Sequence, residues 1–221
     1  MKSKIKNIAI IIKLLKQAIN HFKNPIVTEV SETTKDPFLV LISCLLSLRT
    51  KDAVTAIASK RLFRLAKTPK QMLKLTKNQI ENAIYPVGFY STKAKRIKEI
   101  CKILIKVYNE KVPANEEKLL ELPGIGRKCM GIIMCYGFNK NVSIPVDSHV
   151  HQIANRLGWV SAKTPEKTEQ ELMKLIPKKY WHDLNNLLVS HGQNICVPIS
   201  PFCSKCCIRK YCTRIDIQRS R

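Results

Sequence analysis

Hydrophobic positions along the chain recur at spacings of three and four, as expected for the buried faces of amphipathic helices. The first such stripe consists of Ile5, Ile8, Ile12, Leu15, Ile19 and Phe22. A predicted helix over residues 93–108 places Ile97, Ile100, Leu104 and Tyr108 on one face. No segment shows the apolar–polar alternation typical of a strand. The pattern therefore predicts an all-α fold of about ten short helices.

Capping residues indicate where several of these helices begin and end. Three positions combine an N-cap side chain with a proline in the first turn: Asp36-Pro37, Thr68-Pro69 and Thr164-Pro165. Thr76 and Gln79 have the spacing of a capping box. At the other end of a helix, Gly192 is expected to terminate residues 180–191.

Two apolar stretches were considered as targeting or membrane segments. In the first, Ile8 to Ile12, the run is cut short by Lys13 and Lys16, which leaves it too short for the hydrophobic part of a signal peptide. The second, residues 38–46, is about half the length that spans a bilayer. We therefore expect the basic N-terminal segment to be mature structure, and we expect no transmembrane helix.

The charge of the chain indicates a polyanionic partner. Its 221 residues include 39 Lys and Arg against 16 Asp and Glu, which gives a formal net charge of +23. This excess is larger than solubility requires, and nucleic acid is the commonest partner of such proteins; a membrane surface is the alternative. With 45% hydrophobic residues, the chain can form one large domain or two small ones, and no low-complexity linker separates them.

Four of the nine cysteines form a compact array, C-x6-C-x2-C-x5-C, at Cys196, Cys203, Cys206 and Cys212. The others are Cys44, Cys101, Cys129, Cys135 and Cys207. Disulfides are not expected, because five further cysteines accompany the array and we expect no secretory signal. Four thiolates suit either a tetrahedral zinc site or a [4Fe–4S] cluster. Only Cys203 and Cys206 are separated by two residues, and the other two cysteines lie at wider spacings, which favours the larger [4Fe–4S] cluster. Cys207 is expected to point away from the metal.

A glycine-containing turn joins two predicted helices, residues 115–122 and 127–137. It reads Leu-Pro-Gly-Ile-Gly-Arg-Lys over residues 122–128. Gly124 and Gly126 permit a tight turn and a close approach of the backbone to a ligand, and the second helix offers its positive dipole end. These features predict a phosphate-binding site. The alternative is an ordinary helix–helix corner that needs glycine only for the turn.

Lys128 and Asp147 are candidates for catalysis. Lys128 stands in the first turn of a predicted helix, beside Arg127. The positive end of the helix dipole and the charge of Arg127 would both lower the pKa of Lys128, which favours a free amine that could act as a nucleophile. Its alternative role is a solvated phosphate contact. Asp147 precedes a predicted helix over residues 149–157, where an N-cap is the ordinary interpretation. The two roles of Asp147 can coexist, because capping fixes the direction of a carboxylate.

Taken together and in order, three motifs resemble the endonuclease III family of helix-hairpin-helix DNA glycosylases. They are the turn at 122–128, Val-Asp-Ser-His at 146–149, and the cysteine array. The likeness continues upstream through residues 45–52 and 88–94, so it covers nearly the whole chain.

The resemblance implies a two-lobed helical protein with a C-terminal iron–sulfur loop. Residues 30–140 would form a six-helix barrel that ends in the hairpin. Residues 1–29 would combine with 141–221 in a second lobe, whose loop 196–212 holds a [4Fe–4S] cluster. The implied partner is damaged double-stranded DNA, bound between the lobes by a monomer. No membrane is involved, and the implied location is the cytoplasm, in association with the nucleoid.

The implied reaction is that of a bifunctional DNA glycosylase and AP lyase, which flips out an oxidised pyrimidine, removes it and nicks the strand by β-elimination. Lys128 would attack C1′ and form a Schiff base, while Asp147 would stabilise positive charge on the sugar and help prepare the lysine. The implied DNA-contacting residues are Arg49, Lys51, Leu122, Gly124, Ile125, Gly126, Arg127 and His149. The implied cluster ligands, with a structural role, are Cys196, Cys203, Cys206 and Cys212.

Three departures from the family pattern bear on DNA contact. Arg49 replaces a glutamine that fills the gap left by the flipped base, and Cys129 replaces the usual threonine after the lysine. Loop 197–202 lacks basic residues, so its phosphate contact is expected to be lost or moved to Lys205.

Two other functions remain compatible with parts of the sequence. An adenine-specific mismatch glycosylase shares the cysteine spacing and the aspartate, but it lacks the lysine and carries an added C-terminal domain. A non-catalytic DNA-binding module would keep the hairpin and the cluster while Lys128 merely touched phosphate. Lys128 argues against the first alternative, and the presence of both Lys128 and Asp147 argues against the second.

Overall fold

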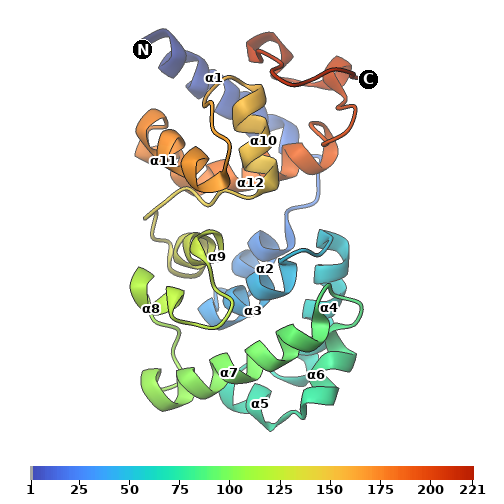
Figure 1. Ribbon diagram of the computed structural model, residues 1–221, viewed down its shortest axis with the longest axis vertical. Coiled ribbons are helices and arrows are strands. Elements are labelled where there is room, and N and C mark those ends of the chain that lie inside the picture. The colour runs from blue at the N-terminus through green and yellow to red at the C-terminus, as the bar shows by residue number, and fades with distance from the viewer. Residues whose placement is uncertain (1) are drawn as a thin grey trace. The chain divides into compact units, whose positions relative to one another are not determined.

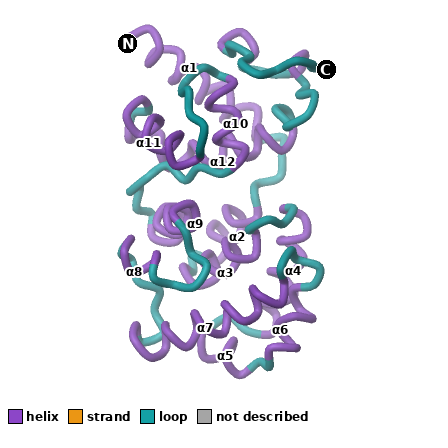
Figure 2. Tube along the Cα trace, viewed as in Figure 1, coloured by secondary structure: helices purple, strands orange, loops and turns teal. Residues whose placement is uncertain are grey.

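The computed structural model describes residues 2–221, with side chains described from Asn7 onward. Throughout this range the secondary structure is helical, without strands (Figure 2), which confirms the predicted all-α class. The α-helices are α1 (Lys2–Ile19), α2 (Ile26–Thr34), α3 (Pro37–Ser47), α4 (Asp52–Leu65), α5 (Pro69–Lys74), α6 (Lys77–Ile84), α7 (Tyr90–Tyr108), α8 (Glu116–Leu120), α9 (Arg127–Ile132), α10 (Ser148–Arg156), α11 (Pro165–Leu175) and α12 (Trp181–Asn194). None of these described helices is long and apolar enough to cross a membrane.

The chain divides into two compact units (Figure 1). One contains residues up to Pro25 together with Asn141–Arg221, and the other is Ile26–Lys140. The unit Ile26–Lys140 begins before residue 30, the start that the family resemblance implies for the six-helix barrel. Ile26 opens α2, and its backbone N–H donates to Oδ2 of Asp52 over 3.0 Å, which ties the start of α2 to the start of α4 within the same unit.

The continuous unit, Ile26–Lys140, is organised around α3. Every residue of α3 from Phe38 to Leu46 is buried, as expected for an apolar helix covered on all sides. Helices α2 and α4 pack against it, as does a π-helical turn, η1 (Ile133–Gly137), while α5 and α6 pack against α7. Six helices, α2 to α7, thus precede the α8–α9 hairpin. The helix predicted over 127–137 is therefore α9 continued by this π-helical turn.

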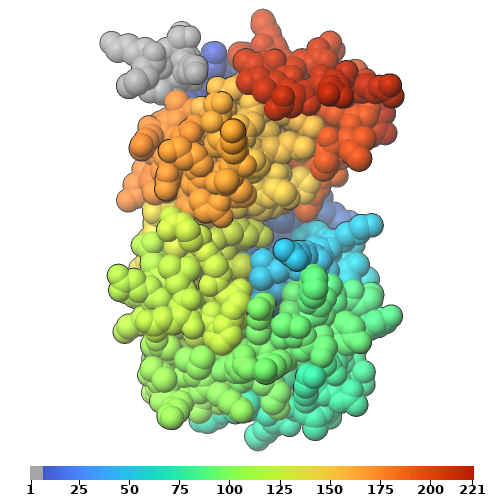
Figure 3. Space-filling model, viewed as in Figure 1, coloured from blue at the N-terminus to red at the C-terminus, as the bar shows by residue number. Residues whose placement is uncertain are grey.

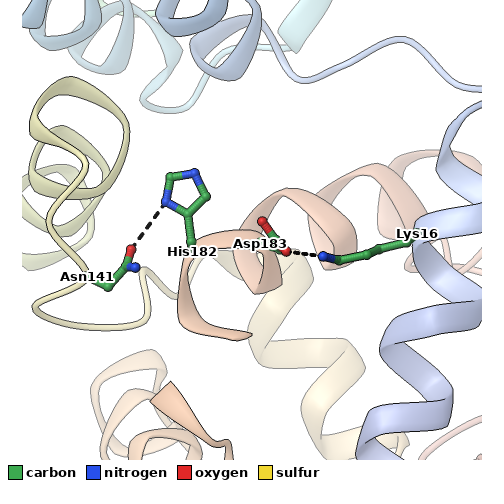
Figure 4. A network of polar contacts seen from close by, with 4 residues as sticks. All are labelled: Lys16, Asn141, His182 and Asp183. Carbon is green, nitrogen blue, oxygen red and sulfur yellow. Dashed lines mark hydrogen bonds and ion pairs between the residues drawn. The ribbon is translucent and has the colours of Figure 1, made fainter. Parts of the chain in front are cut away.

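The discontinuous unit joins the N-terminal helix to the last third of the chain. Both α1 and α10 pack against α12, and Ile8, Ile12 and Leu15 of the predicted stripe are buried in this core. Ile5 lies outside the residues whose side chains are described. On the surface, Lys16 of α1 forms an ion pair with Asp183 of α12 (Figure 4).

Local capping chemistry accounts for most of the predicted helix starts. The side chains of Asp36, Thr68 and Thr164 each accept a hydrogen bond from a backbone amide of the helix they precede. Thr76 and Gln79 make both bonds of a capping box. These predictions are confirmed.

The prediction that Gly192 ends a helix is wrong, because α12 continues to Asn194. A Cβ atom added at Gly192 would lie 2.6 Å from Nδ1 of His149 in α10. Glycine is therefore needed inside this helix so that α10 and α12 can approach closely. A sequence pattern cannot distinguish this tertiary use from a helix stop.

Candidate functional site

The hairpin between α8 and α9 uses its two glycines differently. Gly124 has φ of +82°, and a Cβ atom there would lie 2.8 Å from Cδ of Arg96, so the turn itself requires glycine. Gly126 is extended, with φ of −101°, and an added Cβ atom would meet nothing within 4 Å. Its surroundings are therefore open to a ligand. The side chains of Leu122 and Ile125 are buried, so these two residues can offer only backbone groups.

Lys128 is half-buried in the first turn of α9 and belongs to a small cluster of titratable groups. The next residue, Cys129, is buried and turned inward, and its thiol is hydrogen-bonded to that of Cys44 in α3. This bond raises the pKa of Cys44 and lowers that of Cys129, and the charge of Lys128 favours both thiolates. The cysteine that replaces the family's threonine is therefore a core residue here.

Asp52 is a further member of the same electrostatic neighbourhood. Burial raises the pKa of its carboxyl above the usual range, whereas the hydrogen bond from Ile26 N and the charge of Lys128 act in the opposite direction. Lys128 is therefore within electrostatic reach of a carboxylate of its own unit. Arg127, by contrast, is exposed at the start of α9.

Asp147 caps α10 in the discontinuous unit. Its Oδ1 atom accepts hydrogen bonds from the backbone N–H groups of His149 and Val150, both at 2.9 Å. The N-cap interpretation is thus confirmed, and the carboxylate is half-buried with a fixed direction. His149, two residues on, is half-buried against Gly192. Lys128 and Asp147 belong to different units.

Arg49 lies beside an exposed aromatic side chain. Its backbone is left-handed, with φ of 50°, and its guanidinium carbon is 5.7 Å from the ring centroid of Phe89. Phe89 is also left-handed, with φ of 57°, and its side chain is 63% exposed. Bulky residues rarely adopt this conformation, and such strain is concentrated at functional sites. Lys51, at the N-cap position of α4, is exposed nearby in the sequence.

Buried Lys93 holds this loop in place. Its Nζ atom donates to the carbonyl oxygens of Leu46 (2.8 Å) and Leu48 (2.6 Å), which end α3, and to Oγ1 of Thr50 (3.2 Å). Burial lowers the pKa of Lys93 to about 8. Although its pKa is depressed, its amine is fully engaged with oxygen atoms, so Lys93 positions the Arg49 loop and is a poor candidate for a nucleophile.

The four cysteines of the array line one cavity in the discontinuous unit. Cys196, Cys203, Cys206 and Cys212 all line the same small pocket, together with Arg156 and His191. The loop that carries them lies on the surface of the unit, near the red end of the colour scale in Figure 3. Cys207 is not part of the lining; its Sγ atom faces the carbonyl oxygen of Leu14, at 3.9 Å.

The cysteine donor set fits an iron–sulfur cluster. Among the described residues, no three His, Cys, Asp or Glu side chains are gathered closely enough to hold a single metal ion. Four thiols spread around a common cavity are, however, the ligands that a [4Fe–4S] cluster takes. Burial raises the pKa of Cys206 to about 12 and also raises those of Cys196 and Cys212. Metal binding must therefore displace thiol protons.

Two side chains contact the sulfur atoms of this array. Arg156 of α10 donates to Sγ of Cys196 (3.3 Å) and to the carbonyl oxygens of Cys196, Val197 and Pro198, so it holds the start of the loop. His191 of α12 places Nε2 at 3.5 Å from Sγ of Cys206. Burial lowers the pKa of His191 to about 4.

Sequence reasoning missed several residues whose roles depend on their three-dimensional surroundings. Lys93 and Arg156 look like ordinary surface cations of amphipathic helices, and Phe89 looks like a helix-entry residue. Asp52 and His191 carry no local pattern of their own. The available signal was proximity: Phe89 and Lys93 lie inside segment 88–94, and Asp52 ends segment 45–52, both of which carry the family likeness.

Comparisons with known proteins identify the family of the chain. Residues 42–178 match the family model described as HhH-GPD superfamily base excision DNA repair protein. Endonuclease III of Thermotoga maritima is 45% identical over 177 residues, which cover 80% of this chain and 83% of that protein. Endonuclease III-like protein 1 of Mus musculus is 40% identical over 79% of this chain, which spans 59% of the mouse protein.

A solved structure is similar over nearly the whole chain. It is described as a trapped endonuclease III–DNA covalent intermediate in an estranged-adenine complex. Its TM-score is 0.83, with 29% sequence identity over 95% of both chains.

The fold and its hairpin therefore define a member of the HhH-GPD superfamily of base excision DNA repair proteins. Within that superfamily, the chain belongs to the endonuclease III family, which consists of DNA glycosylases with AP lyase activity. The protein is accordingly a bifunctional glycosylase and lyase of base excision repair. This membership does not agree with a non-catalytic DNA-binding module.

Proposed function

We propose that the protein removes oxidised pyrimidines from duplex DNA, using Lys128 as the nucleophile, and then nicks the strand at the resulting abasic site. The observation that carries this proposal is the position of Lys128, half-buried directly after a hairpin whose Gly126 faces open space. A phosphate held at this hairpin would bring the flanking sugar close to the lysine amine. The proposed state is a monomer acting on nucleoid DNA in the cytoplasm.

The proposed chemistry proceeds through a covalent intermediate. The neutral amine of Lys128 attacks C1′, and the base departs with the electrons of the glycosidic bond. Ring opening gives a protonated Schiff base between Nζ and C1′, which acidifies the C2′ proton. Loss of that proton breaks the C3′–O bond and releases the 3′ phosphate. Water then hydrolyses the Schiff base and returns the free amine.

Asp147 is proposed to stabilise the positive charge that develops on the sugar. Its direction is fixed by the two amide hydrogen bonds from α10, so no reorganisation is needed when the charge appears. A carboxylate performs the same electrostatic task in glycoside cleavage.

DNA contact is proposed for exposed groups near the hairpin and the Arg49 loop. The hairpin contributes the backbone of Gly124, Ile125 and Gly126 and the side chain of Arg127. Arg49 and Phe89 form an exposed cation–π pair that suits insertion beside an unpaired base. Lys51 would contact phosphate, as would Lys205. His149 would act from the start of α10.

Binding to undamaged duplex DNA is expected to weaken steeply with salt. Phosphate neutralisation by Lys and Arg releases counterions, so affinity should fall on the order of 10³-fold between about 50 and 200 mM salt. A fluorescence anisotropy titration at several salt concentrations measures this slope. A flat response would leave the charge of +23 without a role in DNA binding.

The two hairpin glycines are expected to respond differently to alanine. Gly124→Ala should destabilise the protein by about 1–2 kcal/mol, because alanine would have to adopt a left-handed backbone conformation at this position. Gly126→Ala should leave the melting temperature nearly unchanged, while its methyl group obstructs phosphate and weakens DNA binding. Thermal melts and anisotropy on both variants separate these effects. If the folded Gly126→Ala variant binds DNA with unaltered affinity, the hairpin is an ordinary helix–helix corner and not a phosphate-binding site.

We propose that Cys196, Cys203, Cys206 and Cys212 hold a structural [4Fe–4S] cluster. When bound, the cluster supplies cross-links that fix loop 196–212 and the exposed residues on it. The four half-buried thiols lie around one common cavity, and among the described residues they are not gathered closely enough for a single ion, which supports this assignment over a zinc ion.

Iron content tests this ligand set. The purified protein should be yellow-brown and contain about four irons per chain. Cys203→Ala should lower iron content and the melting temperature, whereas Cys207→Ala should leave both unchanged, because Cys207 lies outside the cavity. Equal effects of the two substitutions, or zinc in place of iron, would contradict the assignment.

The function is tested by the products formed from three duplexes. One carries thymine glycol, one an abasic site, and one adenine opposite 8-oxoguanine. We expect release of thymine glycol, and a strand nick with an unsaturated aldehyde at the 3′ end on the first two duplexes. Adenine release without a nick would favour the mismatch glycosylase. Binding without any product would contradict the proposed function.

A further inference from the structure

His191 is a buried polar side chain that the proposed reaction does not use. It lies in α12 with 1% of its surface exposed, and it lines the cavity of the four cysteines. Its Nε2 atom is 3.5 Å from Sγ of Cys206. Its Nδ1 atom is buried and, within the described part of the chain, has no hydrogen-bond partner.

The two ring nitrogens indicate which one carries the proton. An imidazole with one ring proton has one N–H donor and one bare nitrogen, and a buried polar group left without a partner is costly. With the proton on Nδ1, the donor would be buried without a partner. With the proton on Nε2, it is directed at the Cys206 sulfur. Nε2–H is therefore the favoured form, and it donates to the sulfur.

The position of His191 is fixed by packing. Its neighbour Gly192 lies against His149 of α10, where an added Cβ atom would lie 2.6 Å from Nδ1 of His149, so α10 and α12 pack closely at this point. His191 also differs from Arg156, the other donor to a sulfur of the array. Arg156 additionally holds three carbonyl oxygens of the loop, whereas within the described part of the chain the His191 ring hydrogen-bonds only to Cys206. Its effect on the sulfur can thus be separated from the folding of the loop.

We propose that His191 is a positioning residue for Cys206, and that its N–H···S hydrogen bond raises the reduction potential of the cluster. The inference rests on the [4Fe–4S] assignment made under the proposed function. A donor directed at a ligand sulfur withdraws electron density from it, which stabilises the more negatively charged, reduced state of the cluster. Loss of the bond would therefore shift the potential to a more negative value and make oxidation easier.

The test uses the cluster-loaded full chain and measures the midpoint potential of its one-electron couple, together with iron content. His191→Phe keeps the size of a flat ring but has no N–H, while His191→Gln keeps an N–H donor. Ser190→Ala is the matched control, because Ser190 is the adjacent buried residue of α12 and its hydroxyl has no partner among the described residues. We expect a more negative potential for the Phe variant, and values close to wild type for the Gln variant and the control.

Loss of iron from His191→Phe, with iron and potential retained in His191→Gln, would also support the proposal. An unchanged potential in an iron-loaded Phe variant would overturn it. So would an equal shift in Ser190→Ala, or loss of iron from both His191 variants. If the cofactor assignment itself is wrong, the result is different: the iron content of the wild-type protein will not be about four per chain. Failure of the proposed catalysis is seen only in the DNA product assays.

Discussion

Lys128→Gln is expected to bind lesion-bearing duplex DNA but to lose both borohydride trapping and strand nicking. Glutamine preserves polarity and most of the length, yet its amide nitrogen cannot form a Schiff base. Loss of a covalent nucleophile lowers turnover by on the order of 10³-fold or more. The affinity for DNA should change by at most about 1.4 kcal/mol, a factor of ten. Single-turnover nicking, reductive trapping and anisotropy measure the three quantities.

Lys102→Gln is the matched control for this substitution. Lys102 is exposed on α7 and belongs to the same unit, so its replacement removes the same charge from another place. We expect wild-type trapping from this variant. A trapped complex from Lys128→Gln would mean that another amine is the nucleophile. Lys93 is a poor substitute, because its amine is bound by three oxygen atoms.

Asp147→Asn is expected to slow base excision without unfolding the protein. Asparagine keeps an oxygen that can accept from the amides of His149 and Val150, and it is as good an N-cap as aspartate. It loses the negative charge that opposes the developing sugar cation. The barrier should therefore rise by about 2–4 kcal/mol, which corresponds to a 10²–10³-fold slower single-turnover rate.

Asp147→Ala separates capping from catalysis. Alanine removes both the charge and the two cap bonds, so this variant should lose about 1 kcal/mol of stability in addition to activity. Thermal melts of the Asn and Ala variants, compared with their excision rates, distinguish the two roles. If Asp147→Asn melts early while excision is unchanged, capping is the whole role of Asp147.

The features that could be predicted from the sequence are those with local causes. Helix starts can be predicted where a capping side chain accepts a hydrogen bond from a backbone amide only two or three residues away, as at Asp36, Thr68 and Thr76. The turn at Gly124 can be predicted because its backbone is left-handed, a conformation that glycine adopts readily. Asp147 was recognised as a cap for the same kind of reason.

The features that could not be predicted depend on what packs against them. Gly192 resembles a helix stop, but it is a contact point for His149. Lys93 has the pattern of a solvated lysine, but its amine is buried among carbonyl oxygens. Cys129 stands beside the candidate nucleophile, yet it faces the core and Cys44. Each of these roles is set by residues far away in the sequence.

The measurement that tests the central claim most directly is identification of the residue that becomes attached to DNA. The wild-type protein is incubated with an abasic duplex, reduced with borohydride, digested with nuclease and protease, and analysed by tandem mass spectrometry. We predict a single modified peptide, with the sugar remnant on Nζ of Lys128. A remnant on any other residue, or no modified peptide from a reaction that nicks the strand, would contradict the assignment.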